Sequence, residues 1–172
     1  LATPESDKLL PQYIIEKLSD LTGGRSIIVT GVGQHQMWAG QLYKFMEPNS
    51  LISSGGLGAM GYEVPSAVGA QLGRPDKVVW TLAGDGGFQM TMPELATMVE
   101  NNVPVKIALL TNQSLGMVRQ WQSLFYNNSF VATKYTGNPD FVKLAEAYGI
   151  PGMKVSQKDQ VADAITWAME KP

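Results

Sequence analysis

The sequence predicts an α/β fold, a three-layer sandwich with a mainly parallel sheet at its centre. Short apolar segments rich in β-branched residues alternate with longer segments in which apolar residues recur every three or four positions. Strands that alternate with helices typically form a parallel sheet covered by helices on both faces. The chain of 172 residues has no internal repeat and no linker-like segment. We therefore expect residues 1–172 to form a single domain with a sizeable core.

The first half of the chain should contain three helices and one strand. Residues 11–21 carry apolar side chains at helical spacing and predict an amphipathic helix. Residues 26–30 predict a short strand, followed by a Gly-x-Gly turn and a helix over residues 34–44. Residues 62–71, rich in small side chains, predict a closely packed helix that ends at residues 73–75.

Two buried strands are expected next, joined by a helix. Residues 77–83 form a β-rich apolar segment typical of a buried parallel strand, and residues 103–110 form another. Between them, Thr91 is the expected N-cap of the helix. Pro93 would lie just inside the helix and Glu94 three residues after the cap. Together these segments form a βαβ unit.

The last third of the chain should contain three helices and a strand. Residues 114–123 predict a helix, and the polar and aromatic residues 125–137 predict a mobile loop near the functional site. Asn138 and Pro139 should cap a helix that Gly149 ends.

A short strand at residues 151–155 and a last helix complete the expected elements. Ser156 should cap this helix, and one side of it carries Val161, Ile165 and Met169. The helical pattern is still closing at residues 170–172, and the chain begins without Met. We therefore expect a domain excised from a longer polypeptide.

The composition narrows the possible functions. Hydrophobic residues make up 44% and charged residues 16% of the chain, which is typical of a globular domain, and the net charge of −2 favours neither nucleic acid nor an anionic membrane as partner. No apolar run approaches the length of a transmembrane helix, and residues 1–8 lack the order of a signal peptide. The absence of cysteine excludes disulfides, thiolate catalysis and zinc–sulfur sites, and it fits a reducing compartment.

Glycines and two oxygen-bearing side chains follow the two buried strands. Gly84, Asp85, Gly86 and Gly87 come after the first strand, and Asn112 comes after the second. The carboxyl ends of parallel strands meet at one edge of a sheet, so the carboxylate and the carboxamide should share a crevice. A hard oxygen pair beside a glycine-rich anion cradle suits Mg²⁺ that carries a diphosphate. A tight turn with a capping Asp and an unrelated loop Asn is the alternative, and the pattern alone does not decide between them.

Two other patterns allow more than one interpretation. Gly56-x-Gly58-x-x-Gly61 matches the dinucleotide fingerprint, and Asp85 lies near the position of its ribose-binding acid, which would indicate an NAD-type domain. Against this, residues 46–50 are a poor strand, and the fingerprint gives no role to the glycines after Asp85 or to the later Asn. His35, the only histidine, is more often a structural residue when alone, but its place after a strand and a Gly-x-Gly turn favours phosphate contact.

Several motifs together resemble one family. Gly84-Asp85-Gly86 followed by Asn112 is similar to the diphosphate and metal signature of thiamine diphosphate enzymes. The stretches Gly33-Gln-His-Gln-Met-Trp-Ala39, Ser54-Gly-Gly-Leu-Gly-Ala-Met-Gly-Tyr62 and Leu115-Gly-Met-Val-Arg-Gln-Trp121 resemble acetohydroxyacid synthase (acetolactate synthase). The resemblance runs from about Pro11 to the end of the chain. Thr111 departs from it, because many members carry a second Asn there.

The resemblance implies a role for each residue of these motifs. Gln34 and His35 would contact the diphosphate of the cofactor, and Gly84, Gly86 and Gly87 would cradle it. The metal ligands would be Asp85, Asn112 and the backbone carbonyl of Ser114. Gly58 would offer its carbonyl to the 4′-amino group of the aminopyrimidine, Met60 would wedge between the two cofactor rings, and Leu115, Gly116 and Met117 would border the cofactor. Met117, Val118 and Trp121 would face the substrate channel. Core packing is the alternative for Met60, and a core stripe is the alternative for Met117 and Trp121.

The implied function is carboligation that depends on thiamine diphosphate and Mg²⁺. Pyruvate would lose CO₂ and its hydroxyethyl unit would join a second 2-keto acid, giving acetolactate or acetohydroxybutyrate for branched-chain amino acid synthesis. The family's activating Glu lies on another domain, normally from a neighbouring subunit, and no residue here matches it, so the chain alone should be inactive. The flavin (FAD) site of the full-length enzyme also lies largely outside this region.

The resemblance also implies a homodimer or homotetramer with a possible small regulatory subunit. The enzyme would be cytoplasmic in a bacterium and located in a plastid or mitochondrion in a eukaryote. Pyruvate oxidase and pyruvate decarboxylase are the nearest rivals, and the Gln-His-Gln-Met-Trp and Gln-Trp stretches favour the synthase. A non-catalytic domain that binds thiamine diphosphate or a subunit remains a further alternative.

Overall fold

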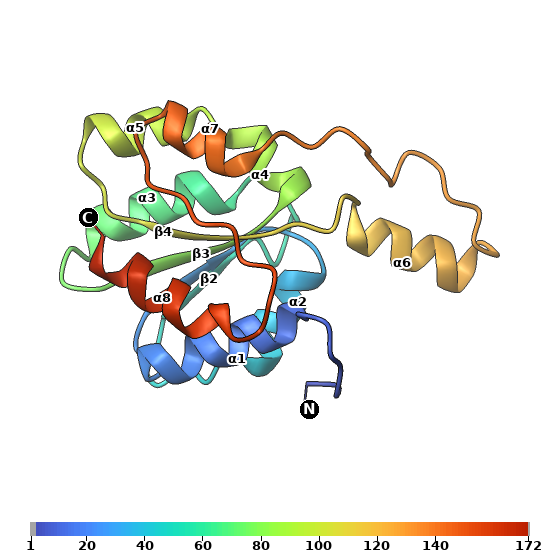
Figure 1. Cartoon of the computed structure of the whole chain (residues 1–172), viewed down its shortest axis with the longest axis horizontal. Coiled ribbons are helices and arrows are strands. Elements are labelled where there is room, and N and C mark those ends of the chain that lie inside the picture. The colour runs from blue at the N-terminus through green and yellow to red at the C-terminus, as the bar shows by residue number, and fades with distance from the viewer. Residues whose placement is uncertain (1–2, 172) are drawn as a thin grey trace.

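A four-stranded sheet lies between two layers of helices in the computed structural model, which describes residues 3–171 (Figure 1). All neighbouring strands are parallel, in the order β2-β1-β3-β4. The strands are β1 (Ile27–Thr30), β2 (Leu51–Ser53), β3 (Val79–Gly84) and β4 (Lys106–Leu110). The α/β sandwich with a parallel sheet that the sequence predicts is therefore confirmed.

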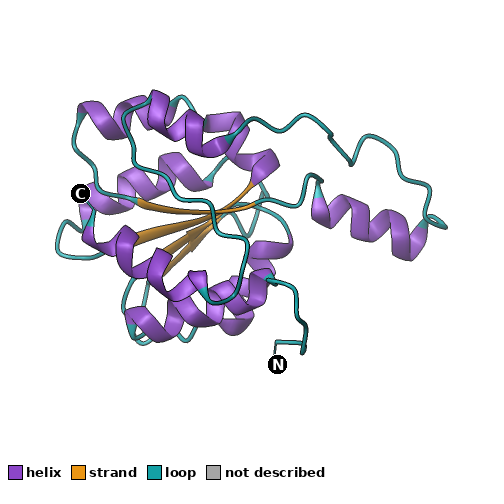
Figure 2. Ribbon diagram, viewed as in Figure 1, coloured by secondary structure: helices purple, strands orange, loops and turns teal. Residues whose placement is uncertain are grey.

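Among residues 3–171, seven helices pack on the two faces of the sheet and an eighth projects from it (Figures 1 and 2). One face carries α3 (Glu63–Gly73), α4 (Asp85–Thr91), α5 (Glu94–Glu100) and α7 (Phe141–Ala147). The other face carries α1 (Pro11–Thr22), α2 (Gln34–Leu42) and α8 (Gln160–Glu170). The helix α6 (Gly116–Phe125) extends away from these layers.

The two cores follow from the alternation of side chains along the central strands. In β1, Ile27 and Val29 pack into the core beneath α3, α4 and α5, whereas Ile28 packs into the core beneath α1, α2 and α8. In β3, Trp80 and Leu82 belong to this second core. Both faces of a central strand are thus buried, which explains why these strands are apolar throughout rather than alternating.

Most of the predicted helices and strands occur at or close to the predicted positions. The first helix ends where Gly23 takes a left-handed conformation (φ 58°) and its N–H bonds back to the Asp20 carbonyl. Val161, Ile165 and Met169 lie on the side of α8 that packs into the second core, as predicted.

One strand was not expected. Leu51–Ser53 forms β2 at the edge of the sheet, directly after residues 46–50. Three residues are too few for a periodic pattern, and its neighbour β1 supplies the pairing that makes it a strand. Residues 46–50 themselves form no strand, as the sequence indicated, but the fingerprint at residues 56–61 does follow the short edge strand β2, so this objection to the dinucleotide interpretation loses its force.

The start of the helix after β3 also differs from the prediction. The helix α4 begins at Asp85, so Gly86 and Gly87 lie in its first turn rather than in a loop. Thr91 does not cap the next helix, because its hydroxyl donates to the Gly61 carbonyl at 2.9 Å. The helix α5 begins at Glu94, with Pro93 as the preceding residue.

Two further predicted N-caps are wrong. The carboxylate of Asp140, rather than Asn138 and Pro139, accepts hydrogen bonds from the N–H groups of Val142 and Lys143 at the start of α7. At the last helix, Asp159 rather than Ser156 occupies the cap position, and no side chain accepts a hydrogen bond there.

The predicted strand at residues 151–155 does not form. A cavity of about 870 Å³ is lined by β4 on one side and by residues 150–155 on the other, so these segments do not pair. Apolar composition alone cannot make a strand, because a strand also needs a partner within hydrogen-bonding distance of its backbone. Within residues 3–171, no helix is both long enough and apolar enough to span a membrane.

Candidate functional site

The predicted site residues meet at the edge of the sheet where β1, β3 and β4 end. Gln34 and His35 begin α2 after β1, Asp85 begins α4 after β3, and Asn112 follows β4 by two residues. Because the three strands are parallel and adjacent, their carboxyl ends present these side chains on the same edge.

Asp85 lies at the centre of this edge and is only 2% exposed. Five donors bond to its carboxylate. Oδ1 accepts from the Gly86 N–H (3.0 Å) and the Tyr135 hydroxyl (2.9 Å), and Oδ2 accepts from the Asn112 N–H (3.2 Å), the Gln113 N–H (2.8 Å) and the Asn138 amide (2.9 Å). The carboxylate therefore links β3, the turn after β4 and a distant loop.

The turn after β4 aims two backbone donors at Asp85. Gln113 adopts a left-handed conformation (φ 54°), which turns its N–H and that of Asn112 toward the same carboxylate oxygen. Asn112 Oδ1 accepts from the Ser114 N–H at 3.0 Å. The carbonyl of Ser114 accepts no hydrogen bond from the described residues. Two of the predicted metal ligands, Asn112 and Ser114, thus lie in one hydrogen-bonded turn, and Asp85 is bonded to that turn.

Two glycines allow the segments around Asp85 to approach closely. A Cβ on Gly86 would lie 2.8 Å from both Leu115 Cδ2 and the Tyr135 hydroxyl, and 3.5 Å from Met60 Cε. A Cβ on Gly116 would lie 2.5 Å from Gln34 Oε1 and 2.9 Å from Asn112 Nδ2. A side chain at either position would displace the ends of these neighbouring side chains, so the glycines allow their close approach to the backbone.

His35 is packed against the glycines at the ends of β1 and β3. Its Cε1 would lie 3.1 Å from a Cβ on Gly33 and 3.0 Å from one on Gly84. Burial lowers the pKa of His35 to about 4, and the nearby Asp85 charge opposes this shift only in part. Its Nε2 has no hydrogen-bond partner among the described residues. The imidazole is therefore neutral near pH 7, and one of its ring nitrogens is buried without a partner among the described residues.

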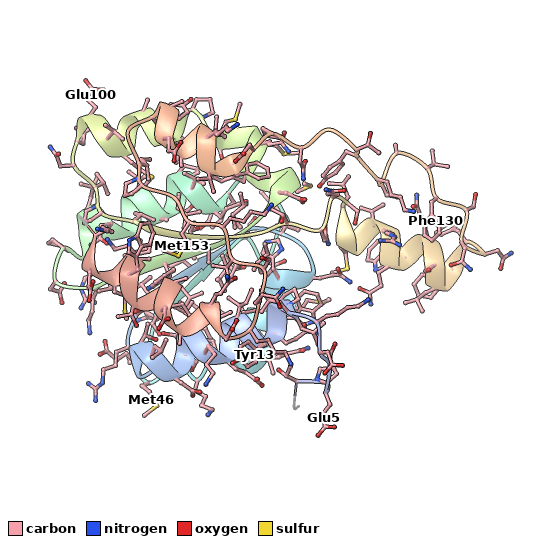
Figure 3. All side chains as sticks on the ribbon, viewed as in Figure 1. Glu5, Tyr13, Met46, Glu100, Phe130 and Met153 are labelled. Atoms are coloured by element: carbon pink, nitrogen blue, oxygen red, sulfur yellow. The ribbon has the colours of Figure 1, made fainter. Side chains whose placement is uncertain are left out.

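Residues 112–138 form an arm that leaves β4, contains α6 and returns to Asp85 (Figure 1). Phe130 lies on the outer part of this arm (Figure 3). Ser114 and Lys134 form an isolated antiparallel bridge at its base. Gln34 Nε2 donates to Gln120 Oε1 at 2.9 Å and so joins α2 to α6.

The predicted substrate residues lie on α6, away from the centre of the site. Val118 is 43% and Trp121 is 57% exposed, and Met117 is half-buried. No residue of α6 is buried, so a core stripe formed by Met117 and Trp121, the alternative that the sequence left open, is wrong. Gly58 (φ 67°) and Met60 come from the loop before α3, which reaches the start of α4 through the sulfur end of Met60.

Sequence reasoning missed the residues that close the site. Tyr135 and Asn138 are 50 and 53 residues from Asp85, and Gln89 Nε2 also donates to Asn138 Oδ1 at 3.3 Å. Burial and the hydrogen bond to Asp85 raise the pKa of Tyr135, so its phenol stays protonated and acts as a donor. No local sequence pattern predicts these contacts, because they form only where the arm folds back onto Asp85.

The arrangement fits a magnesium diphosphate chemically. A carboxylate, a carboxamide oxygen and a carbonyl are hard oxygen donors of the kind that Mg²⁺ prefers. Beside them, the buried Nε2 of His35 has no hydrogen-bond partner among the described residues and is a candidate contact for an anion. Among the described residues no group of three acidic, His or Cys side chains could hold a metal, so a site here would use only one carboxylate.

Comparison with known proteins agrees with the resemblance that the sequence motifs show. Residues 31–172 match the family described as "Thiamine pyrophosphate enzyme, C-terminal TPP binding domain". The chain is 49% identical over 170 residues to the protein named "Acetolactate synthase" of Mycobacterium bovis and 49% identical over 174 residues to "Acetolactate synthase 1, chloroplastic" of Nicotiana tabacum. It is 48% identical over 162 residues to "Acetolactate synthase catalytic subunit, mitochondrial" of Saccharomyces cerevisiae.

These alignments cover 96%, 96% and 92% of the chain, respectively, but only 28%, 26% and 23% of the relatives. The chain thus spans about a quarter of the length of the curated relatives it matches. The family match covers most of the chain and includes every residue of the site described above. The chain therefore belongs to the family of C-terminal TPP-binding domains of thiamine pyrophosphate enzymes.

Proposed function

We propose that this chain holds the diphosphate end of thiamine diphosphate through Mg²⁺ and serves an acetolactate synthase. The protein that contains it would decarboxylate pyruvate and join the two-carbon unit to a second 2-keto acid, giving acetolactate or acetohydroxybutyrate. The family match supports the cofactor, and the identity of 48–49% to three proteins named acetolactate synthase supports the reaction.

The observation that carries the proposal is the convergence of Asp85, Asn112 and Ser114 beside the first turn of α4. Asp85 and Asn112 would offer side-chain oxygens to the metal, and Ser114 would offer its carbonyl. The diphosphate would lie against the first turn of α4, where Leu115 Cδ2 and the Tyr135 hydroxyl now lie 2.8 Å from a Cβ built on Gly86. The metal would be shared between these oxygens and the diphosphate, which offsets the charge of both.

The other residues would orient the cofactor. Neutral His35 can donate or accept one hydrogen bond at its free nitrogen without adding a charge, and Gln34 lies beside it. The carbonyl of Gly58 would accept from the 4′-amino group, and Met60 would hold the two rings apart. Bound thiamine diphosphate supplies the carbon nucleophile and the electron sink for decarboxylation. Met117, Val118 and Trp121 would face the acceptor keto acid.

A calorimetric titration with thiamine diphosphate and Mg²⁺ tests the metal assignment. We expect Asp85→Ala in the complete protein to abolish metal-dependent cofactor binding, and Asn112→Ala to weaken it less, because only the first removes a charge. Glu146→Gln is a matched control, since it removes an exposed carboxylate on α7. Affinity equal to that of wild type in Asp85→Ala would show that the metal lies elsewhere.

The partners that we propose follow from the same relatives. The activating Glu would come from another domain of a neighbouring subunit, so the active form would be a homodimer or homotetramer. FAD and a small regulatory subunit would bind outside these residues. Sedimentation of the complete protein, together with flavin absorbance after purification, tests both points.

A further inference from the structure

The carboxylate of Asp85 has no lone pair left for a cation. A carboxylate offers about four lone-pair positions. Asp85 already accepts hydrogen bonds from five donors, at 2.8–3.2 Å. A metal ion that coordinates either oxygen must therefore displace at least one of these donors.

The five donors differ in how easily they can leave. Three are backbone N–H groups, one in the first turn of α4 and two in the turn that directly follows β4. Moving them would disturb the junctions of the sheet with these segments. The other two are the side chains of Tyr135 and Asn138, at the end of the arm. They can rotate away without breaking any strand pairing.

The base of the arm is held independently of these two side chains. The bridge between Ser114 and Lys134 and the hydrogen bond between Gln34 and Gln120 do not involve Asp85. Within residues 135–138, only the Tyr135 N–H bonds back to this base, to the Gln113 carbonyl at 3.2 Å, so release of these residues would break one backbone hydrogen bond. The Tyr135 hydroxyl also stands over Gly86, at 2.8 Å from a Cβ position there, so its departure would uncover the first turn of α4.

We propose that Tyr135 and Asn138 form a latch that competes with the metal ion for Asp85, an inference that rests on the metal site of the proposed function. Each latch bond lowers the fraction of the protein in which Asp85 can receive the ion, and the apparent metal affinity falls by the same fraction. Linkage makes the effect reciprocal, so the bound ion loosens residues 135–138 as much as the latch weakens the ion. Loading of the metal and release of the arm's end are thereby coupled.

Mn²⁺ is a suitable probe, because the free ion is measured directly by electron paramagnetic resonance. The complete protein is titrated with Mn²⁺ at a fixed thiamine diphosphate concentration. We expect Tyr135→Phe and Asn138→Ala each to bind Mn²⁺ at least about tenfold more tightly than wild type, since each removes one hydrogen bond to a charged group. Tyr126→Phe is the control, because Tyr126 is an exposed tyrosine of the same arm whose hydroxyl bonds to no described residue, and it should leave the affinity unchanged.

Amide hydrogen exchange provides a second readout that does not depend on activity. Saturating Mn²⁺ should speed exchange of the Tyr135 amide, the N–H among residues 135–138 that makes a hydrogen bond, and leave β3 and β4 protected. Unchanged exchange there, or Mn²⁺ affinity in Tyr135→Phe and Asn138→Ala no tighter than wild type, would overturn the latch. The variant Asp85→Ala distinguishes a failure of the latch proposal from a failure of the proposed function. If that variant still binds Mn²⁺ as tightly as wild type, the proposed metal site is wrong, and the latch proposal is then wrong as well.

Discussion

At the scale of single residues, the burial of His35 lowers the stability of the folded protein at acid pH. Its imidazole is 9% exposed, and the free nitrogen has no partner among the described residues. Burial lowers its pKa from 6.5 to about 4. Between pH 6.5 and pH 4 the unfolded chain therefore binds a proton at His35 that the folded protein does not bind. The folded protein loses stability as the pH falls through this interval.

We predict that His35→Gln removes this part of the pH dependence. A shift of this size corresponds to about 3 kcal/mol. The difference in unfolding free energy between the variant and wild type should thus change by about 3 kcal/mol from pH 7 to pH 4, in favour of the variant at low pH. Urea denaturation across this range measures it. A constant difference would contradict the lowered pKa.

The comparison must be a difference between variants, because Glu63 titrates with the opposite sign. Glu63 is fully buried, neither carboxyl oxygen makes a regular hydrogen bond, and burial raises its pKa above 4.5. The folded protein holds that proton when the unfolded chain has lost it, so this group costs stability as the pH rises above 4.5. When the pH falls toward 4.5, protonation therefore lowers the stability through His35 and raises it through Glu63.

Residue-scale prediction from the sequence succeeded for the groups that follow strands. Asp85 and Asn112 could be placed together because each comes directly after a buried strand of a parallel sheet. Tyr135 and Asn138 could not, since their contact with Asp85 closes a loop of more than 45 residues. The protonation of His35 also depends on tertiary burial, which a sequence does not state.

At the scale of elements, helix starts were the weakest predictions. Asp140 and Ser156 are both plausible caps by residue type, but only the Asp140 side chain accepts from the first N–H groups of its helix. Cap geometry depends on the backbone angles before the helix, and residue type alone does not fix these. The strand predicted at residues 151–155 failed for a related reason, because its pairing with β4 is a tertiary property.

We predict that Asp140→Ala destabilises the protein by about 1 kcal/mol, the usual cost of losing a side-chain N-cap. Ser156→Ala should change stability by less than about 0.5 kcal/mol, because that side chain caps nothing. Thermal and urea unfolding of the two variants, measured side by side, checks the assignment. Equal losses would mean that the start of α7 does not depend on Asp140.

The exposed face of α6 leads to a prediction about specificity. Trp121 is 57% exposed and touches no core, so Trp121→Leu should change stability by less than about 0.5 kcal/mol. If Trp121 lines the acceptor pocket, discrimination between pyruvate and 2-ketobutyrate should fall in part, because an apolar pocket is worth only about 1–3 kcal/mol per methylene. Competition assays and melting curves on the same variant distinguish a role of Trp121 in the substrate pocket from a role in the core. An unchanged product ratio would remove Trp121 from the substrate site.

At the scale of the whole molecule, the sheet order explains why one edge carries the chemistry. The strands β1, β3 and β4 are adjacent, so the three segments that follow them meet at a single edge. The loop after β2 reaches the same place through Met60. The fold class could be predicted because central strands and amphipathic helices have clear patterns. The position of the arm could not, since α6 has an apolar face that packs against nothing among the described residues.

That apolar face and the content of the site predict how the 172 residues behave alone. They carry the proposed metal ligands but no residue that matches the activating Glu of the resembled family. We therefore predict that the purified chain forms no acetolactate from pyruvate, even with saturating thiamine diphosphate and Mg²⁺.

The exposed side chains of Val118, Trp121, Leu124 and Phe125 should also drive the isolated chain to self-associate. Sedimentation measured at several protein concentrations tests this. The variant Trp121→Lys, which places a charge on the same face, should shift the chain toward monomer.

In the test of activity, the acetolactate formed by the purified chain is measured against a blank that contains cofactor and no protein. Turnover above this blank would mean that an acid within these residues activates the pyrimidine, and that the division of labour between domains proposed above is wrong.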